Sequence, residues 1–525
     1  MTIRLLAILL LAVGLSAAEL SLTPTQVTLV DGRIVAGQLA AELDQHLIVY
    51  SPGLGTLASF RKEFVASYTR DKQTVKVSAP KKLGPEDLLR LDWNGWPDAA
   101  PEKGGKPAYT TETWDKPKRL VVWSKPGVSG KFNEAANWTV YGAAVEGATL
   151  WSEDTDVLLP ASDKPYVIAA GSGGDNRFEV LSRHLTAESG SGITLQGGMP
   201  LGNLWVRQGG RYSHRFGVGF RGSKHTFCRV EGPAVRRAKG TGIEWLEVKE
   251  GRAASSLGQY VITKKEAGGS VEFLGVISSN DKFFVESGIA VIGPGCSVMS
   301  SNRSPDRVHP GATLRLMSGA ILGKHIQKSK GEAVWCQGTI EVGTKERPIT
   351  EDAFIALPLK DFSGVMDGRG VDSLDKPFDV AVGFNLYEQG SLRVTSADPT
   401  KARLVFCYFS RETGPDSLDF NINPGHLNSR AEIYKRIPRR IDICLRGDTS
   451  GLDGVLFEDC YKGGIRLKDL KQKDAWKHVF YGTRNGGKPE ELVALWADGH
   501  NPSGWIEEMT KVLAELGETT KGAKK

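Results

Sequence analysis

The sequence predicts an all-β protein: a right-handed parallel β-helix with a small N-terminal β-barrel domain and C-terminal capping helices. Three observations predict this fold class. The chain has 62 glycines and only 6 methionines among 525 residues, a composition that favours turns and short strands. Along the body of the chain, glycines are followed by short runs of alternating apolar and polar residues. Near the N-terminus, a group of short β-branched runs surrounds an Asp-Gly turn.

Residues 1–18 have the features of a cleavable secretory signal peptide. Arg4 supplies a positive charge, residues 5–15 are apolar, and three small residues precede Glu19. The apolar run is well short of the roughly 20 residues that span a bilayer, and no later segment is long and apolar enough. We therefore expect an exported protein that is periplasmic, held at the cell surface or extracellular. We expect no transmembrane segment after signal removal.

Residues 19–70 are expected to form the small barrel, with a hairpin at Asp31 and Gly32. Its run 27–39 resembles the Sm-like or SH3-like barrels at the front of exported bacterial proteins. Such barrels can bind RNA, but export argues against a nucleic-acid partner here, so the resemblance implies a docking or assembly module. The four expected strands are at 26–30, 33–39, 46–50 and 64–68.

Residues 71–118 are rich in Pro, Gly and Lys and are expected to be a linker. One short helix is expected near 85–93, with Pro85 in its first turn. At the other end of the chain, residues 486–525 are expected to form helices over 489–496 and 505–516 and a basic tail. The apolar side of the second helix would cover the open end of the body.

Residues 119–485 are expected to form the parallel β-helix. The glycine units that begin at Gly269, Gly288, Gly311 and Gly338 are separated by 19, 23 and 27 positions. Such irregular spacing does not suit a propeller, but it suits a coil whose turns carry loops of variable length. A β-sandwich or a jelly roll uses the same kind of short strands and stays open as an alternative. The scarcity of regular hairpin signals favours the β-helix.

Two segments of the body resemble parts of known families. Residues 130–138 followed by 154–160 resemble the Asn-Trp entry of exported bacterial β-helix proteins, which suggests a pectin-lyase-like fold. Residues 338–349 followed by 353–357 resemble the closing segment of the eight-glycine domain of cell-surface, hyaluronan-associated proteins. The interval between these two segments is longer than that domain usually needs, so the second resemblance is partial.

The charge and the cysteines limit the possible partners and cofactors. The formal net charge of +6 becomes +5 without Arg4, which slightly favours acidic partners such as anionic polysaccharide. The six cysteines include no Cys-x-x-Cys pair, and neither His309 nor any other histidine stands at metal-ligand spacing. No metal and no cofactor are therefore expected. Export permits disulfides, while the apolar run around Cys407 equally fits a buried free thiol.

No local motif identifies a catalytic centre. Polysaccharide lyases and glycoside hydrolases need convergent acidic, basic or aromatic groups, and two Gly- and Asp-containing segments supply them, although the same residues also suit turns. The candidate catalytic residues in these segments are Asp367, Arg369, Asp416, Asp419 and His426.

Three functions remain open from the sequence. The first is a non-catalytic envelope or extracellular protein that binds glycan or a surface partner. The second is a polysaccharide lyase or glycoside hydrolase on the same scaffold. The third is a structural or assembly component of the envelope. The absence of a visible catalytic set favours the first and third, although the active sites of such folds are assembled from distant segments.

Overall fold

The fold was examined in a computed structural model, which is all-β. Among the described residues there is no α-helix, and the helical elements are two 3-10 turns, η1 (Lys62–Phe64) and η2 (Ala135–Asn137). No helix in this described part of the chain is long and apolar enough to cross a membrane. The structure describes residues 20–52, 56–77, 116–132, 134–142, 154–169, 183–195, 199–207, 210–214, 217–220, 225–230, 254–256, 260–263, 269–279, 282–300, 305–324, 333–358, 384–409, 443–458, 465–467, 477–482, 490–491 and 496–497.

The chain divides into two compact units. The first comprises Met1–Lys125, Glu134–Pro160 and Leu181–His184, and the second comprises Pro126–Asn133, Ala161–Val180 and Leu185–Lys525.

The first unit contains a six-stranded antiparallel sheet with the order β4-β3-β2-β1-β5-β6. The expected hairpin at Asp31 and Gly32 is confirmed, because β1 and β2 pair on either side of it and Gly32 has a φ of +87°. The small domain was expected to end at residue 70, whereas β6 extends its sheet to Lys76. Its strands are β1 (Thr23–Leu29), β2 (Ile34–Glu42), β3 (His46–Ser51), β4 (Thr56–Arg61), β5 (Val65–Arg70) and β6 (Gln73–Lys76).

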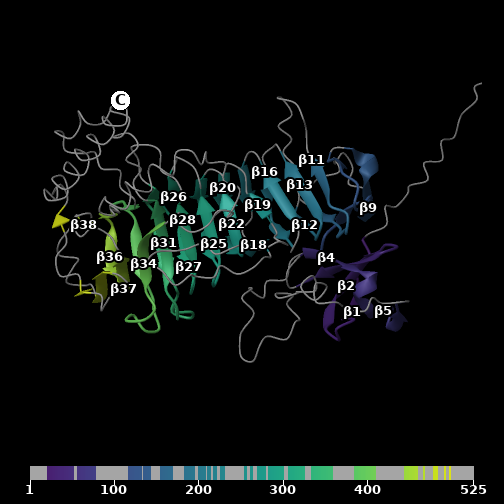
Figure 1. The fold of residues 1–525 in the computed structure, drawn as a ribbon, viewed down its shortest axis with the longest axis horizontal. Coiled ribbons are helices and arrows are strands. Elements are labelled where there is room, and N and C mark those ends of the chain that lie inside the picture. Colours follow the sequence, from purple (N-terminus) through teal and green to yellow (C-terminus); the bar gives the residue numbers. More distant parts are fainter. Residues whose placement is uncertain are drawn as a thin grey trace, which may run out of the picture. The chain divides into compact units, whose positions relative to one another are not determined.

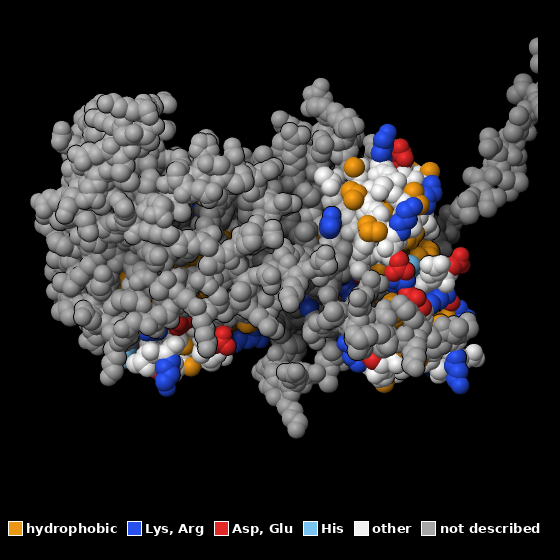
Figure 2. All heavy atoms as spheres, in the orientation of Figure 1, with side chains coloured by type: hydrophobic (Ala, Val, Ile, Leu, Met, Phe, Trp, Pro, Cys, Tyr) orange, Lys and Arg blue, Asp and Glu red, His pale blue; other side chains and the backbone are white. Residues whose placement is uncertain are grey.

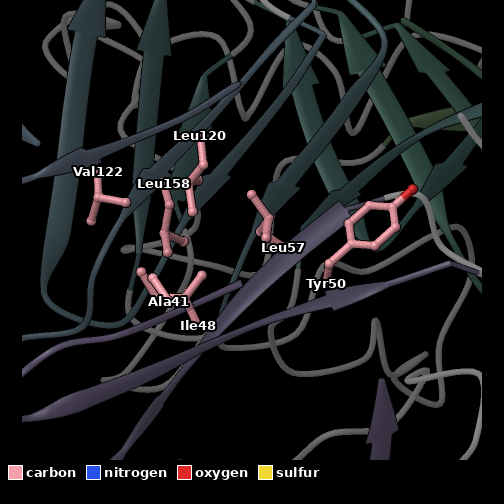
Figure 3. Close-up of a cluster of buried hydrophobic side chains, with 7 residues drawn as sticks. All are labelled: Ala41, Ile48, Tyr50, Leu57, Leu120, Val122 and Leu158. Atoms are coloured by element: carbon pink, nitrogen blue, oxygen red, sulfur yellow. The ribbon is translucent and has the colours of Figure 1, made fainter. Parts of the chain in front are cut away.

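A second group of strands in the first unit packs against this sheet. There β7 (Arg119–Trp123) pairs antiparallel with β9 (Trp138–Gly142) and parallel with β10 (Thr155–Leu159). Figure 3 shows the contact, in which the side chains of Leu120 and Leu158 point toward those of Ala41 and Ile48. The shared core consists of Ala41, Ile48, Tyr50, Leu57, Leu120, Val122 and Leu158.

Most of the segment expected to resemble an Asn-Trp entry, residues 134–138 and 154–160, lies in the first unit, while residues 130–133 belong to the second. The Trp123 and Trp138 rings pack edge to face with centroids 4.9 Å apart. Asn137 precedes Trp138, donates to Glu134 Oε2 over 2.9 Å and accepts from Lys125 Nζ over 3.4 Å. These bonds hold the turn that leads into β9.

The second unit is built from three long sheets of parallel strands. From β13 to β38 the chain visits the sheets in strict rotation, so that every third strand returns to the same sheet beside its predecessor. We call one strand from each sheet, taken in order, a circuit; β24, β25 and β26 form one. Figure 1 shows these strands following one another in chain order. Because the pairing is parallel, these strands form neither an antiparallel sandwich nor a jelly roll.

The strands of the first parallel sheet within this unit are β15 (Asn203–Val206), β18 (His225–Val230), β21 (Ser270–Leu274), β24 (Ile289–Ile292), β27 (Thr313–Leu316), β30 (Thr339–Val342), β33 (Ser391–Val394) and β36 (Asp448–Gly451), while β12 (His184–Ala187) is divided between the units. Those of the second are β8 (Gly130–Lys131), β11 (Tyr166–Ala169), β13 (Ser191–Leu195), β16 (Arg211–His214), β19 (Ala254–Ser256), β22 (Val276–Ser279), β25 (Ser297–Ser300), β28 (Ile321–Lys324), β31 (Ala353–Pro358), β34 (Leu404–Phe409), β37 (Asp453–Glu458), β39 (Lys477–Gly482) and β40 (Glu490–Glu491). Those of the third are β14 (Met199–Leu201), β17 (Gly217–Phe220), β20 (Tyr260–Thr263), β23 (Lys282–Val285), β26 (Asp306–Val308), β29 (Val334–Cys336), β32 (Phe384–Leu386), β35 (Ile443–Leu445), β38 (Ile465–Leu467) and β41 (Trp496–Ala497).

Alternation along the strands explains how the sheets bury one face. In β27 and β30 the second and fourth residues are buried and the others are half-buried, as expected when side chains alternate across a pleated strand. The glycines before these strands are required by geometry. Gly311 has a φ of +78°, a conformation in which a side chain would be strained. A Cβ at Gly338 would clash with the carbonyl oxygens of Ala312 and His309.

The helix expected over residues 489–496 is wrong at the residues described there. Glu490 and Glu491 form β40, which pairs antiparallel with β39. Trp496 begins β41, which pairs with β38 through Arg466. Open sheet edges offer backbone partners to a following segment, and this pairing overrides the helical pattern of its side chains. The helices expected over 85–93 and 505–516, and the signal peptide, lie outside the described residues.

Candidate functional site

The five candidate catalytic residues lie outside the described part of the chain, but the ends of their two segments are described. Residues 359–383 and 410–442 both connect the second parallel sheet to the third. Pro358 and Phe409, where the segments leave, are register partners, as are Phe384 and Ile443, where they re-enter. The two segments thus start and end on neighbouring strands. The first carries Asp367 and Arg369; the second carries Asp416, Asp419 and His426.

The third parallel sheet carries a row of half-buried side chains on neighbouring circuits. In β26 and β29 the outer residues are buried and the middle residue is not. Strand register aligns Phe284 with Arg307 and Arg307 with Trp335. Alternation places these three residues on the face opposite the core-facing Val308 and its neighbours.

These side chains contact one another across the strands. The guanidinium carbon of Arg307 lies 5.3 Å from the centroid of the Phe284 ring and 4.9 Å from that of Trp335. The His309 ring packs edge to face between the same two rings, at 5.9 Å and 5.8 Å. Tyr387 packs edge to face on Trp335 at 5.3 Å. We call this set of five residues the aromatic ladder.

The ladder differs in its electrostatics from the first parallel sheet. There, Arg315 is paired across strands with Glu341, with Nε to Oε2 at 2.8 Å. Within the described residues, Arg307 has aromatic neighbours but no carboxylate partner. On the face drawn in Figure 2, the described Lys, Arg, Asp and Glu side chains are intermixed.

The ladder has the chemistry and the length to hold an extended ligand. Aromatic rings offer apolar faces with polar edges, and a guanidinium offers up to five donors. Neighbouring strands are about 4.8 Å apart, so the ladder crosses roughly 14 Å from β23 to β32. A linear chain of rings with polar substituents fits such a row better than a compact small molecule.

Several groups with shifted pKa values lie in the interior instead. Burial raises the pKa of Asp156, although Arg183 opposes this through bonds of 2.7 Å and 2.8 Å. Burial raises the pKa of Tyr166 and Tyr212, and it lowers that of His184. Asp156, His184 and the two tyrosines are each at most 1% exposed, so none of them faces a ligand-accessible surface.

The described cysteines whose side chains can be placed are free thiols. Cys228, Cys336 and Cys407 are buried and Cys296 is half-buried, so the alternative of buried free thiols is confirmed for the first three. In the same described ranges, no group of three or more His, Cys, Asp or Glu residues is placed to hold a metal ion.

The ladder is not apparent in the sequence because its members are single residues within strands of three or four or just after them. Trp335 and Arg307 are 28 positions apart, yet register makes them neighbours. A signal that could have found Arg307 and Trp335 is the central residue of each short strand. Every third strand lies in the same sheet, so the central residues of these strands must be compared with one another. Segments of unequal length, such as 325–332, hide that alignment.

No protein-family model, curated protein or solved structure matches this chain.

Proposed function

We propose that this protein is an exported, pectin-lyase-like right-handed parallel β-helix that binds a glycan along the aromatic ladder. The rotation of the chain through three parallel sheets supports the β-helix. The position of η1 between β4 and β5, together with the pairing of β5 with β1, supports an Sm-like or SH3-like barrel at the N-terminus. The features of residues 1–18 support export to the periplasm, the cell surface or the medium.

The aromatic ladder is the observation that carries the proposed binding function. It combines aromatic rings from four circuits with the guanidinium of Arg307, which has no carboxylate partner in the described structure. Sugar rings present apolar C–H faces that pack on aromatic rings, while hydroxyl and acidic substituents accept bonds from Arg. A glycan lying across the strands would use both groups at once.

Affinity electrophoresis of residues 19–525 against neutral and acidic polysaccharides tests this function. A retained glycan is expected to lose about tenfold in affinity with Trp335→Ala and with Arg307→Ala, because each contact contributes about 1 to 2 kcal/mol. Arg315→Ala is the matched control, since Arg315 is also a central residue of a parallel strand but is paired with Glu341. Retardation that Trp335→Ala leaves unchanged would refute binding at the ladder, and retardation by no glycan would favour an assembly role.

Polysaccharide cleavage is the second candidate function. The anchoring of segments 359–383 and 410–442 on neighbouring strands favours it, because a lyase or hydrolase needs groups from adjacent circuits. Release of reducing ends or unsaturated products in the same assays would establish this function. Asp367→Asn and His426→Gln would then be the first substitutions.

A further inference from the structure

An amine and a carboxyl group face each other inside the second unit. Lys324, at the end of β28, places its Nζ 3.2 Å from Oδ1 of Asp306 on β26. The side chain of Lys324 is 1% exposed and that of Asp306 is 2% exposed. The two residues come from different sheets and neighbouring circuits, so a bond between them would join separate parts of the fold.

Both oxygens of Asp306 are held in fixed positions. Oδ1 also accepts a bond from the backbone N–H of Phe283 over 3.0 Å. Oδ2 accepts a bond from the Ser300 hydroxyl over 2.7 Å. The carboxyl carbon therefore lies beside an amine, with one oxygen bonded to an amide and the other to a hydroxyl.

Burial disfavours the charged carboxylate of Asp306. Taking two charges out of water is unfavourable, and a proton passed from the ammonium to the carboxylate removes both charges. Burial raises the pKa of Asp306, against the opposing effects of Lys324, Ser300 and the Phe283 amide. Proton transfer would leave a nucleophilic amine next to a carboxylic acid.

We propose that Lys324 and Asp306 condense to form an intramolecular isopeptide bond. The neutral Nζ attacks Cγ of the protonated carboxyl group, and the developing negative charge on Oδ1 is stabilised by the Phe283 N–H. The amine gives a proton to Oδ2, the Cγ–Oδ2 bond breaks, and one water leaves. Ser300 holds Oδ2 during this step. The ion pair thus becomes a neutral amide and one water, with no oxidant or other reactant.

Position and exclusion of solvent favour this reaction. Two groups held in contact react as if at very high concentration, and the buried site retains no bulk water to reverse the step. Nearby residues on the same strands, such as Val308 and Leu322, are apolar and at most 2% exposed. The bond would join β26 to β28 covalently.

Peptide mapping of the purified wild-type protein tests the proposal. Trypsin cannot cleave after a modified lysine, so residues 304–307 are expected to remain linked to residues 316–328, with the loss of one water. The identity of the linked peptides is essential, because dehydration of Asp306 alone gives the same change in mass. The exposed pair Lys401 and Asp398, 2.9 Å apart, is an internal control that is expected to stay unlinked.

Two variants make the assignment specific. Lys324→Met is expected to abolish the linked peptide, and Ser300→Ala is expected to slow its formation several-fold during refolding. A wild-type digest that contains only separate peptides ending at Lys324 and Arg307 would overturn the proposal. Because that measurement uses the unaltered protein, it holds even if a variant fails to fold. An unchanged rate in Ser300→Ala would overturn the role given to Ser300.

Discussion

The guanidinium carbon of Arg307 lies 4.9 Å from the centroid of the Trp335 ring, on the neighbouring strand of the same sheet. No carboxylate pairs with this arginine among the described residues. Its charge is therefore balanced by the electron-rich faces of Trp335 and Phe284. The contact places the cation between two aromatic rings on neighbouring strands.

This contact is expected to contribute about 0.5 to 1 kcal/mol to the free energy of unfolding, the usual range for a partly exposed cation–π pair. A double-mutant cycle of Arg307→Ala and Trp335→Ala, measured by urea unfolding, gives the coupling energy directly. The same cycle between Arg315→Ala and Trp335→Ala is the control, because those residues lie on different sheets. A coupling energy near zero for the first pair would show that the stacking does not stabilise the fold.

The core shared by β2, β3, β4, β7 and β10 predicts a second effect on stability. Leu57 and Leu158 are each at most 1% exposed within it (Figure 3). Truncating either one to alanine is expected to lower the free energy of unfolding by about 2 to 5 kcal/mol, since a buried leucine leaves a cavity. Chemical denaturation followed by fluorescence measures this. Val128→Ala is the control, because Val128 is 52% exposed, and an equal loss there would contradict the packing.

Local pattern predicted the strands well where one side chain in two is buried. The alternation in Thr313–Leu316 and Thr339–Val342 is visible in the sequence, and both segments are strands. The hairpin at Gly32 was equally predictable, because its turn chemistry is local. The parallel pairing followed from irregular glycine spacing and from the scarcity of hairpin signals.

Features that depend on distant pairing were not predictable. Trp335 becomes a neighbour of Arg307 only through strand register, which a single sequence does not display. Lys324 was unexpected in the interior, because a charged residue at a strand end usually faces solvent. The strand that begins at Trp496 replaced an expected helix, since the open edge at β38 supplied a backbone partner.

His184 predicts how stability depends on pH. Burial holds its pKa well below the ordinary value of 6.5, and Arg183 acts in the same direction. The unfolded chain therefore binds a proton that the folded chain does not. The free energy of unfolding is expected to fall as pH decreases below the unfolded pKa, by up to about 1.4 kcal/mol for each pH unit. Urea unfolding of the wild type and of His184→Gln measures this dependence. The two pH values, 7.5 and 5.5, lie roughly one unit on either side of the unfolded pKa. Equal slopes in the two proteins would contradict this assignment.

Buried and exposed ion pairs are expected to respond differently to the loss of one partner. Arg207 donates to Glu188 over 2.9 Å, with side chains 6% and 3% exposed, whereas Lys118 and Asp154 are 67% and 44% exposed. Glu188→Ala is expected to lower the free energy of unfolding by about 3 to 5 kcal/mol, because it leaves a buried charge without its carboxylate. Lys118→Ala is expected to lower it by about 0 to 1 kcal/mol. Similar losses in the two variants would show that burial does not decide the effect.

The cysteines predict a pattern of chemical labelling. Cys228, Cys336 and Cys407 are buried free thiols, and burial raises the pKa of Cys228 and that of Cys336, the latter to about 12. Because the thiolate is the reactive form, iodoacetamide at neutral pH is expected to leave these three unmodified in the folded protein. The half-buried Cys296 is expected to react before them. In denaturant, all four are expected to be alkylated without a reductant, and peptide mass spectrometry identifies each one. If one of these four cysteines reacts only after reduction, that cysteine forms a disulfide. This result would contradict its assignment as a free thiol.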